Sequence, residues 1–260
     1  MKPDANRKRS SEEYLLSSVR NALRILRSFS EDETEKRVSK LAVELGIGKS
    51  TVSRLLATLE SEGFARRDPE SQKWQLGLTV LSLGGIVKRQ LQLTKESRPV
   101  LMKLVKQTGE SAHVAILEEA DVIYIEQMES PHPLRLPHVG KRNPAFCTST
   151  GKVLLAHKKE EYLEMVISKG LTPFTEHTIT DPIKFLEHIK QVREQKYAVS
   201  IEELTPGVIS VAAPIRNYTG RVVAAVSIAG TTEGFQHYKI NDYKIKVMEA
   251  AKEISENLGY

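Results

Sequence analysis

The stretch VSKLAVELGIGKSTVSRLLATLESEGFARRD, residues 38–68, decides the fold of the N-terminal part of the chain. Apolar residues recur at helical spacing on both sides of Gly46, which predicts two short helices, about 38–45 and 49–62. A helix-turn-helix needs a small residue where its helices press together and a glycine able to take positive φ at the turn. Ala42 and Gly46 supply them in register, and the apolar residues expected to pack inside are Leu41, Leu45, Ile47, Val52 and Leu55.

The outward face of the second of these helices carries short hydrogen-bond donors and long cations near its N-terminus. Such side chains contact phosphates and base edges, and a helix N-terminus itself favours a phosphate. An ordinary core αα-hairpin would share the apolar spacing but would not need this polar face. We therefore predict a DNA reader whose major-groove residues are Lys49, Ser50, Thr51, Ser53 and Arg54.

The residues that follow predict a β-hairpin, with strands at 64–67 and 73–76 and a turn at 68–71. A charged hairpin alone is usually a solvated tip. Next to this helix pair it becomes the wing of a winged helix-turn-helix, and Arg66, Arg67 and Lys73 are expected to contact the DNA backbone. Helical spacing over 19–29 adds the remaining helix of the module.

Composition and charge limit the classes of protein. The chain has 260 residues with 38 basic and 33 acidic side chains, a net charge of +5 that only mildly favours a polyanionic partner. The single cysteine, Cys147, excludes an internal disulfide and a four-cysteine zinc site. No apolar run approaches the roughly 20 residues that span a bilayer, and no secretory signal is evident. We expect a reduced, cytoplasmic protein without membrane partners.

The second part of the chain predicts a different architecture. Residues 77–92 continue at helical spacing as a linker helix, and another helix is expected to follow Pro99. Two β-rich runs around a turn at 118–121, helical runs at 150–170 and 181–195, two strong strands at 207–215 and 222–230, and a helix at 239–257 complete the pattern. This order predicts an α+β domain on an antiparallel sheet.

Catalysis finds little support in this second part. A phosphate-binding loop ending in Gly151-Lys152 would need glycine at position 146, which holds Phe146. A lone Cys147 among small residues before a helix is more often a packing residue than a nucleophile. His132 and His138 flank prolines without metal-ligand spacing. We expect no enzyme activity, no cofactor and no metal.

Binding has better support. The run CTSTGKVLLA places Ser149, Thr150 and Gly151 before a helix, whose N-terminal N–H groups suit a carboxylate, although ordinary N-capping by Ser149 or Thr150 is also open. Ser210 and Ser227 are lone hydroxyls within apolar strands. Each either satisfies a backbone carbonyl or faces a cavity and holds a polar ligand.

Five stretches together resemble the isocitrate-lyase-regulator (IclR-type) family of bacterial transcription factors, in order and over nearly the whole chain: VRNALRILRSF, KLAVELGIGKSTVSRLLATLESEGFARRDPESQKWQLG, MESPHPLRLPHVGKRNPAF, GKVLLA and GVISVAAPI. The resemblance implies an N-terminal winged helix-turn-helix, a linker helix used in dimerisation and a GAF-like effector domain. It also implies dimers or dimers of dimers on palindromic double-stranded operators. The expected divisions are a flexible arm at 1–17, the DNA-binding domain at 18–77, the linker at 78–95 and the effector domain at 96–260.

The resemblance also locates the effector site. It implies ligand contacts at Ser149, Thr150, Ser200, Ser210, Ser227 and Ala229. The chain departs from the small keto-acid pattern of the family, which has an acidic residue near Ser200, a cysteine at Ser210 and a second serine at Ala229. Residues 139–156 look closest to regulators of sugar-acid breakdown. We therefore expect a repressor controlled by a small organic or sugar acid; the alternative is a sensor or enzyme whose helix-turn-helix serves protein–protein contact.

Overall fold

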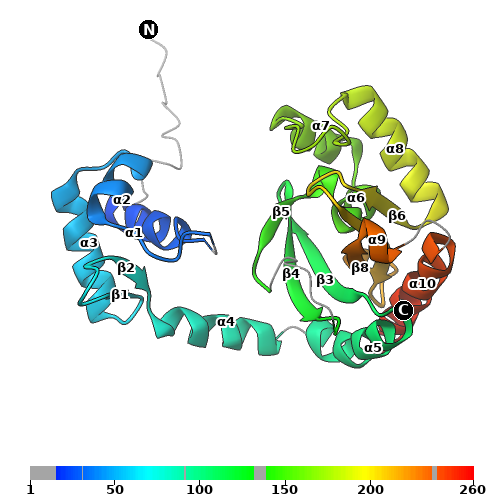
Figure 1. Cartoon of the computed structure of the whole chain (residues 1–260), viewed down its shortest axis with the longest axis horizontal. Helices are drawn as coiled ribbons and strands as arrows, with labels where there is room; N and C mark the ends of the chain where they lie inside the picture. The colour runs from blue at the N-terminus through cyan, green and yellow to red at the C-terminus, as the bar shows by residue number, and fades with distance from the viewer. Residues whose placement is uncertain (1–15, 31, 91, 132–138, 236–238) are drawn as a thin grey trace, which may run out of the picture. The chain divides into compact units, whose positions relative to one another are not determined.

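The computed structural model describes residues 16–30, 32–90, 92–131, 139–235 and 239–260 (Figure 1). Contacts divide the chain into two compact units, 1–87 and 88–260. The division falls inside the segment 78–95 that we predicted as a linker helix. No helix of the described residues is long and apolar enough to cross a membrane.

The N-terminal unit contains the predicted helix-turn-helix, with α1 at Ser17–Arg27, α2 at Val38–Leu45 and α3 at Lys49–Ser61. Gly46 ends α2 in the left-handed conformation at φ 66°, which a residue with a Cβ rarely adopts. Leu41, Ala42 and Val52 are buried as predicted, and Leu45, Ile47 and Leu55 pack against the same core while half-buried. Leu56, which the sequence did not single out, is fully buried. Leu56 lies one turn from Val52 on the face that packs against Ile25 and Trp74.

The wing consists of β1, Ala65–Arg67, and β2, Trp74–Leu76, paired antiparallel. The turn between them is longer than predicted: Asp68 N–H donates to the Lys73 carbonyl at 2.8 Å, and Gln72 takes φ 58°. Trp74 is buried and exchanges both backbone hydrogen bonds with Lys36, so β2 is also attached to the segment before α2. This attachment fixes the wing against the helical core.

Two helices follow the wing, α4 at Leu78–Gln90 and α5 at Gln92–Thr108. The prediction that a helix begins after Pro99 is wrong, because Pro99 lies inside α5. The Pro99 ring is on the exposed side of the helix, so the main cost of the proline is the one backbone hydrogen bond that its missing N–H cannot make. Leu93, Val100 and Leu104 on the opposite side are buried and hold the helix to the sheet across the proline.

The C-terminal unit is built on a six-stranded sheet in the order β5-β4-β3-β8-β7-β6, with every pair antiparallel. The strands are β3 Ser111–Glu118, β4 Asp121–Met128, β5 Arg142–Pro144, β6 Ala198–Ile201, β7 Val208–Arg216 and β8 Val222–Thr231. The two edge strands, β5 and β6, were not predicted from the sequence. They are too short to show an alternating pattern.

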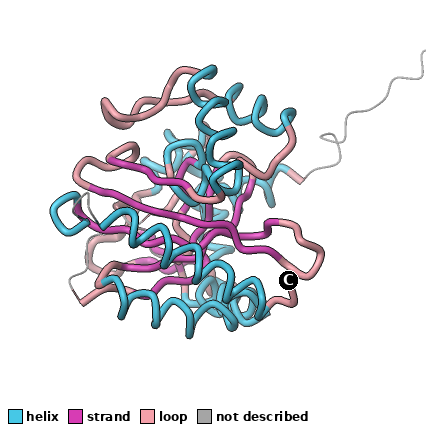
Figure 2. Tube along the Cα trace, turned by 90° about the vertical axis from the view of Figure 1, so that its right-hand side faces the viewer, coloured by secondary structure: helices cyan, strands magenta, loops and turns pink. Residues whose placement is uncertain are grey.

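Helices cover both faces of this sheet (Figure 2). On one face α5 and α10, Ile240–Asn257, pack over Val211, Val226 and their neighbours. On the other lies α6, Ser149–Leu155, preceded by the short helix η2 at Ala145–Cys147 and followed by α7, Glu160–Ser168, and α8, Pro182–Gln195. A short helix, α9 at Thr232–Phe235, follows β8. The predicted α+β architecture is confirmed.

Candidate DNA-binding surface and effector cavity

The polar face of α3 is exposed. The side chains of Lys49, Ser50, Thr51, Ser53 and Arg54 all reach solvent. Within the described residues, Lys49 and Arg54 form no side-chain hydrogen bond or ion pair. The N-cap, Gly48, provides no side chain to the first N–H groups, and Lys49 opposes the helix dipole at that end. The helix therefore presents unsatisfied donors and positive charge together.

The basic residues of the wing differ in how freely their side chains reach solvent. Arg66 and Arg67 are exposed, and the Arg67 guanidinium lies 5.9 Å from the centre of the Trp74 ring. Lys73 is half-buried, and its Nζ lies 3.3 Å from Glu35 Oε2. Glu35 also accepts a hydrogen bond from Gln75. Lys73 is thus held by a carboxylate, whereas the two arginines face solvent.

The C-terminal unit contains a cavity of about 240 Å³ on the α6 side of the sheet. Strand pairing brings the predicted strand residues to it, because Ser210 lies opposite both Ser200 of β6 and Ala229 of β8, and Ser227 lies opposite His113 of β3. Side chains alternate along a strand, so these positions share one face. Ser149, Ser200, Ser210, Ser227 and Ala229 all line the cavity.

Two predicted effector residues lie elsewhere. Thr150 is buried against the Tyr124 hydroxyl, and neither it nor Gly151 lines the cavity. The Gly151 N–H already donates to Thr148 Oγ1 at 3.1 Å, so Thr148, rather than Ser149 or Thr150, caps α6. A Cβ on Gly151 would stand 2.0 Å from the Ala145 carbonyl oxygen. Glycine is required here for packing, and the prediction of a ligand-binding N–H at Gly151 is wrong.

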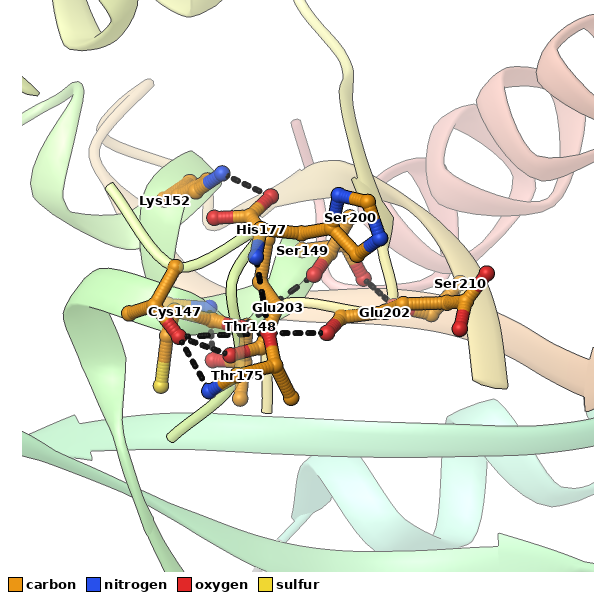
Figure 3. A network of polar contacts seen from close by, with 12 residues as sticks. Cys147, Thr148, Ser149, Lys152, Thr175, His177, Ser200, Glu202, Glu203 and Ser210 are labelled. Atoms are coloured by element: carbon orange, nitrogen blue, oxygen red, sulfur yellow. Dashed lines mark hydrogen bonds and ion pairs between the residues drawn. The ribbon is translucent and has the colours of Figure 1, made fainter. Parts of the chain in front are cut away.

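Hydrogen bonds hold the polar side chains of the cavity wall in place (Figure 3). Ser149 Oγ donates to Ser210 Oγ at 2.8 Å, and Ser200 Oγ donates to the Cys147 carbonyl at 3.2 Å. Ser200 therefore satisfies a backbone carbonyl as well as lining the cavity. Other lining residues that the sequence did not single out are His113, Tyr124, Lys141, Asn143, Glu203 and Thr205.

A buried ion pair adjoins the cavity. Lys152 Nζ contacts Glu203 Oε1, and the two side chains are 0% and 8% exposed. Burial raises the pKa of Glu203 and lowers the pKa of Lys152, because both groups leave water, while each partner's charge opposes the shift. The sequence alone did not reveal this pair, because its members are 51 positions apart.

The described residues offer neither a reactive cysteine nor a metal centre. Burial raises the pKa of Cys147 to about 12, and the nearby Glu203 carboxylate adds to the shift. The thiol therefore stays protonated at neutral pH and is a poor nucleophile. The described residues contain no group of three or more His, Cys, Asp or Glu side chains that could hold a metal ion. His132 and His138 lie outside the described residues.

Comparisons with known proteins identify the family of both parts of the chain. Residues 86–256 match the family described as bacterial transcriptional regulator IclR C-terminal, and residues 18–69 match the IclR helix-turn-helix domain. The transcriptional regulator XynR of Escherichia coli K12 is 31% identical over 248 residues, which cover 95% of this chain and 98% of that protein. The transcriptional repressor IclR of the same strain is 28% identical over 244 residues, covering 92% and 89%.

A solved structure shows the same fold. The IclR homolog from Microbacterium hydrocarbonoxydans, complexed with 4-hydroxybenzoate, superposes with a TM-score of 0.82 at 25% identity, covering 93% of this chain and 99% of that one. The protein is therefore a DNA-binding transcription regulator rather than an enzyme. It belongs to the IclR family.

Proposed function

We propose that α3 enters the major groove and that Lys49, Ser50, Thr51, Ser53 and Arg54 contact base edges and phosphates there. Three observations together support this proposal. The five side chains are exposed, Lys49 and Arg54 have no side-chain partner among the described residues, and the N-terminus of α3 has no side-chain cap. A lysine at a helix N-terminus costs about 0.3–1 kcal/mol of helix stability. A phosphate bound at that end would reverse the cost.

In the wing, Arg66 and Arg67 contact the DNA backbone beside the groove, and Lys73 joins them once it leaves Glu35. Both guanidinium groups are exposed, and guanidinium groups suit phosphate contacts. The ion pair of Lys73 with Glu35 makes this lysine a weaker contributor than the arginines.

DNA reading is tested with a duplex selected from a random pool. Binding of this duplex should weaken steeply with salt, as expected for displaced counterions. Arg54→Ala should cost roughly 1–3 kcal/mol if its guanidinium reads a base. Ser61→Ala at the far end of α3 is the matched control and should change nothing. Equal affinities of the Arg54 variant and the wild type would refute the assignment.

In the C-terminal unit, the cavity binds a small organic or sugar acid that alters operator affinity. Five of the predicted residues line it, and Lys141 supplies positive charge to the same wall. The bound 4-hydroxybenzoate of the Microbacterium homolog, a carboxylate, supports this class of ligand. A ligand changes DNA affinity only if it binds the competent and incompetent arrangements unequally. A thermal-shift screen of carboxylic acids, followed by operator titration with each hit, tests the proposal.

The oligomer is a homodimer or a dimer of dimers that binds a palindromic operator in the cytoplasm. The supporting observation is that five large apolar side chains of α4 are exposed: Leu78, Leu81, Leu83, Ile86 and Val87. Exposed apolar side chains in this number on one helix favour a covering partner. Leu81→Glu should shift the sedimentation profile towards monomer.

The regulator acts as a repressor, as the related IclR protein's name states for that protein.

A further inference from the structure

Glu203 is the unusual group of the effector cavity, because one of its carboxylate oxygens is buried without a hydrogen-bond donor. The residue is 7% exposed and lines the cavity. Its Oε1 contacts Lys152, whereas Oε2 is buried and has no hydrogen-bond partner among the described residues. An ionised carboxylate oxygen left without a donor in a buried position is costly.

The Ser200 hydroxyl does not remove this deficit. Ser200 lies close enough to the Glu203 carboxylate to lower its pKa. A serine hydroxyl has a single proton, however, and that of Ser200 is donated to the Cys147 carbonyl at 3.2 Å. Turning it towards Glu203 would leave the buried carbonyl unsatisfied instead.

The backbone around Glu203 holds the carboxylate in place. Thr178 Oγ1 donates to the Glu203 carbonyl at 2.7 Å, and Thr175 Oγ1 donates to the Glu202 carbonyl at 2.6 Å. Glu202 adopts φ 54°, and its own carboxylate accepts the Gly207 N–H at 2.8 Å. With both sides of the loop fixed and Lys152 on Oε1, Glu203 is a preorganised acceptor.

We propose that Glu203 Oε2 accepts a hydrogen bond from a hydroxyl group of the effector, so that the cavity selects hydroxylated acids over their deoxy analogues. This inference rests on the proposed effector function. Repulsion directs the effector's carboxylate away from Glu203, towards Lys141 and the serines, and leaves its hydroxyl to meet Oε2. Glu203 is thus a specificity-determining residue of the site.

The test compares acids that share a carbon skeleton and a carboxylate but differ in hydroxyl groups. The probes are 4-hydroxybenzoate with benzoate, D-gluconate with hexanoate, and glycolate with acetate, each titrated calorimetrically against the full-length protein. The hydroxylated member of the pair that fits should bind roughly ten to a hundred times more tightly, as expected for a hydrogen bond to a charged group. If acids bind and both members of every pair bind equally, the inference is overturned while the proposed function stands. If no acid binds, the proposed function fails and the inference with it.

Two variants assign the preference to Glu203. In Lys152→Met/Glu203→Met both charges are removed together, which avoids leaving one buried charge unpaired. It should bind both members of a pair with similar affinity, and persistence of the hydroxyl preference would overturn the assignment. Lys103→Met/Glu253→Met is the matched control, because it removes an exposed ion pair between α5 and α10 whose residues do not line the cavity. The preference should be unchanged in it; loss of the preference in this control as well would overturn its assignment to Glu203.

Discussion

Replacing Gly151 with alanine should destabilise the C-terminal unit strongly. The added Cβ would lie 2.0 Å from the Ala145 carbonyl oxygen and 2.3 Å from the Ala145 Cα, whereas ordinary contact begins at 3.4 Å. Either η2 or α6 must move by more than an ångström, and neither contact is the end of a flexible side chain. Overpacking costs typically about 1–3 kcal/mol, and we expect the upper end, about 3 kcal/mol.

In a domain of this size, such a loss lowers the melting temperature by about 6–12 °C, at about 2–4 °C for each kcal/mol. Far-UV circular dichroism measures the unfolding of the whole chain. The single tryptophan, Trp74, lies in the N-terminal core, so its fluorescence reports that unit separately. Gly151→Ala should shift the dichroism transition and leave the Trp74 transition in place.

Gly84→Ala is the matched control, because a Cβ there meets nothing within 4 Å and the residue lies inside α4. Alanine in a helix is favoured over glycine by about 0.5–1 kcal/mol, so this variant should be neutral or more stable. Equal dichroism transitions for Gly151→Ala and Gly84→Ala would refute the packing argument.

Three further predictions concern charge and protonation. Glu35→Gln should release Lys73 and steepen the slope of log K against log[salt] for DNA binding by about 0.9, the value for one added phosphate contact. Glu70→Gln, an equal charge change at the exposed wing tip, should steepen this slope less. Because burial raises the pKa of Cys147 to about 12, iodoacetamide at pH 8 should modify it only after denaturation, as mass spectrometry can show; rapid labelling of the folded protein would contradict this. Burial and the Lys152 charge lower the pKa of His188 to about 4 from 6.5, so the folded state loses stability as pH falls from 6.5 towards 4. His188→Gln should lessen that loss of stability, as denaturant titrations at several pH values can measure. An unchanged pH profile of stability would contradict the assignment.

Local patterns were sufficient for much of the fold. The helix-turn-helix followed from Ala42 and Gly46 in register with an apolar stripe, because turn chemistry and helical period act over a few residues. The helix at 181–195 was predicted from its start at Asp181-Pro182, and in the structure Asp181 caps it by accepting hydrogen bonds from the N–H groups of Ile183 and Lys184. Pro99 misled the prediction because a proline on the exposed side of a long helix is tolerated when the opposite side is well packed.

The cavity could be located only in part. Ser210 and Ser227 were recognisable as hydroxyls in apolar strands. The two-residue alternation of a strand, however, does not tell which of its faces borders a cavity. The pairing of Lys152 with Glu203 depends on how α6 meets the loop after β6, which no local pattern encodes. Gly151 illustrates the opposite error, since a glycine before a helix suggested a ligand site whereas close packing requires it.

The alternation along β7 and β8 has a consequence for how this regulator could change its ligand. Val211 and Val226 face the core formed with α5 and α10, while Ser210 and Ser227 face the cavity. Substitutions on the cavity side therefore remove little of the apolar burial that keeps the domain folded. A new effector preference could arise by single steps at Ser210, Ser227 or Ala229, each of which would leave a folded protein for selection to act upon.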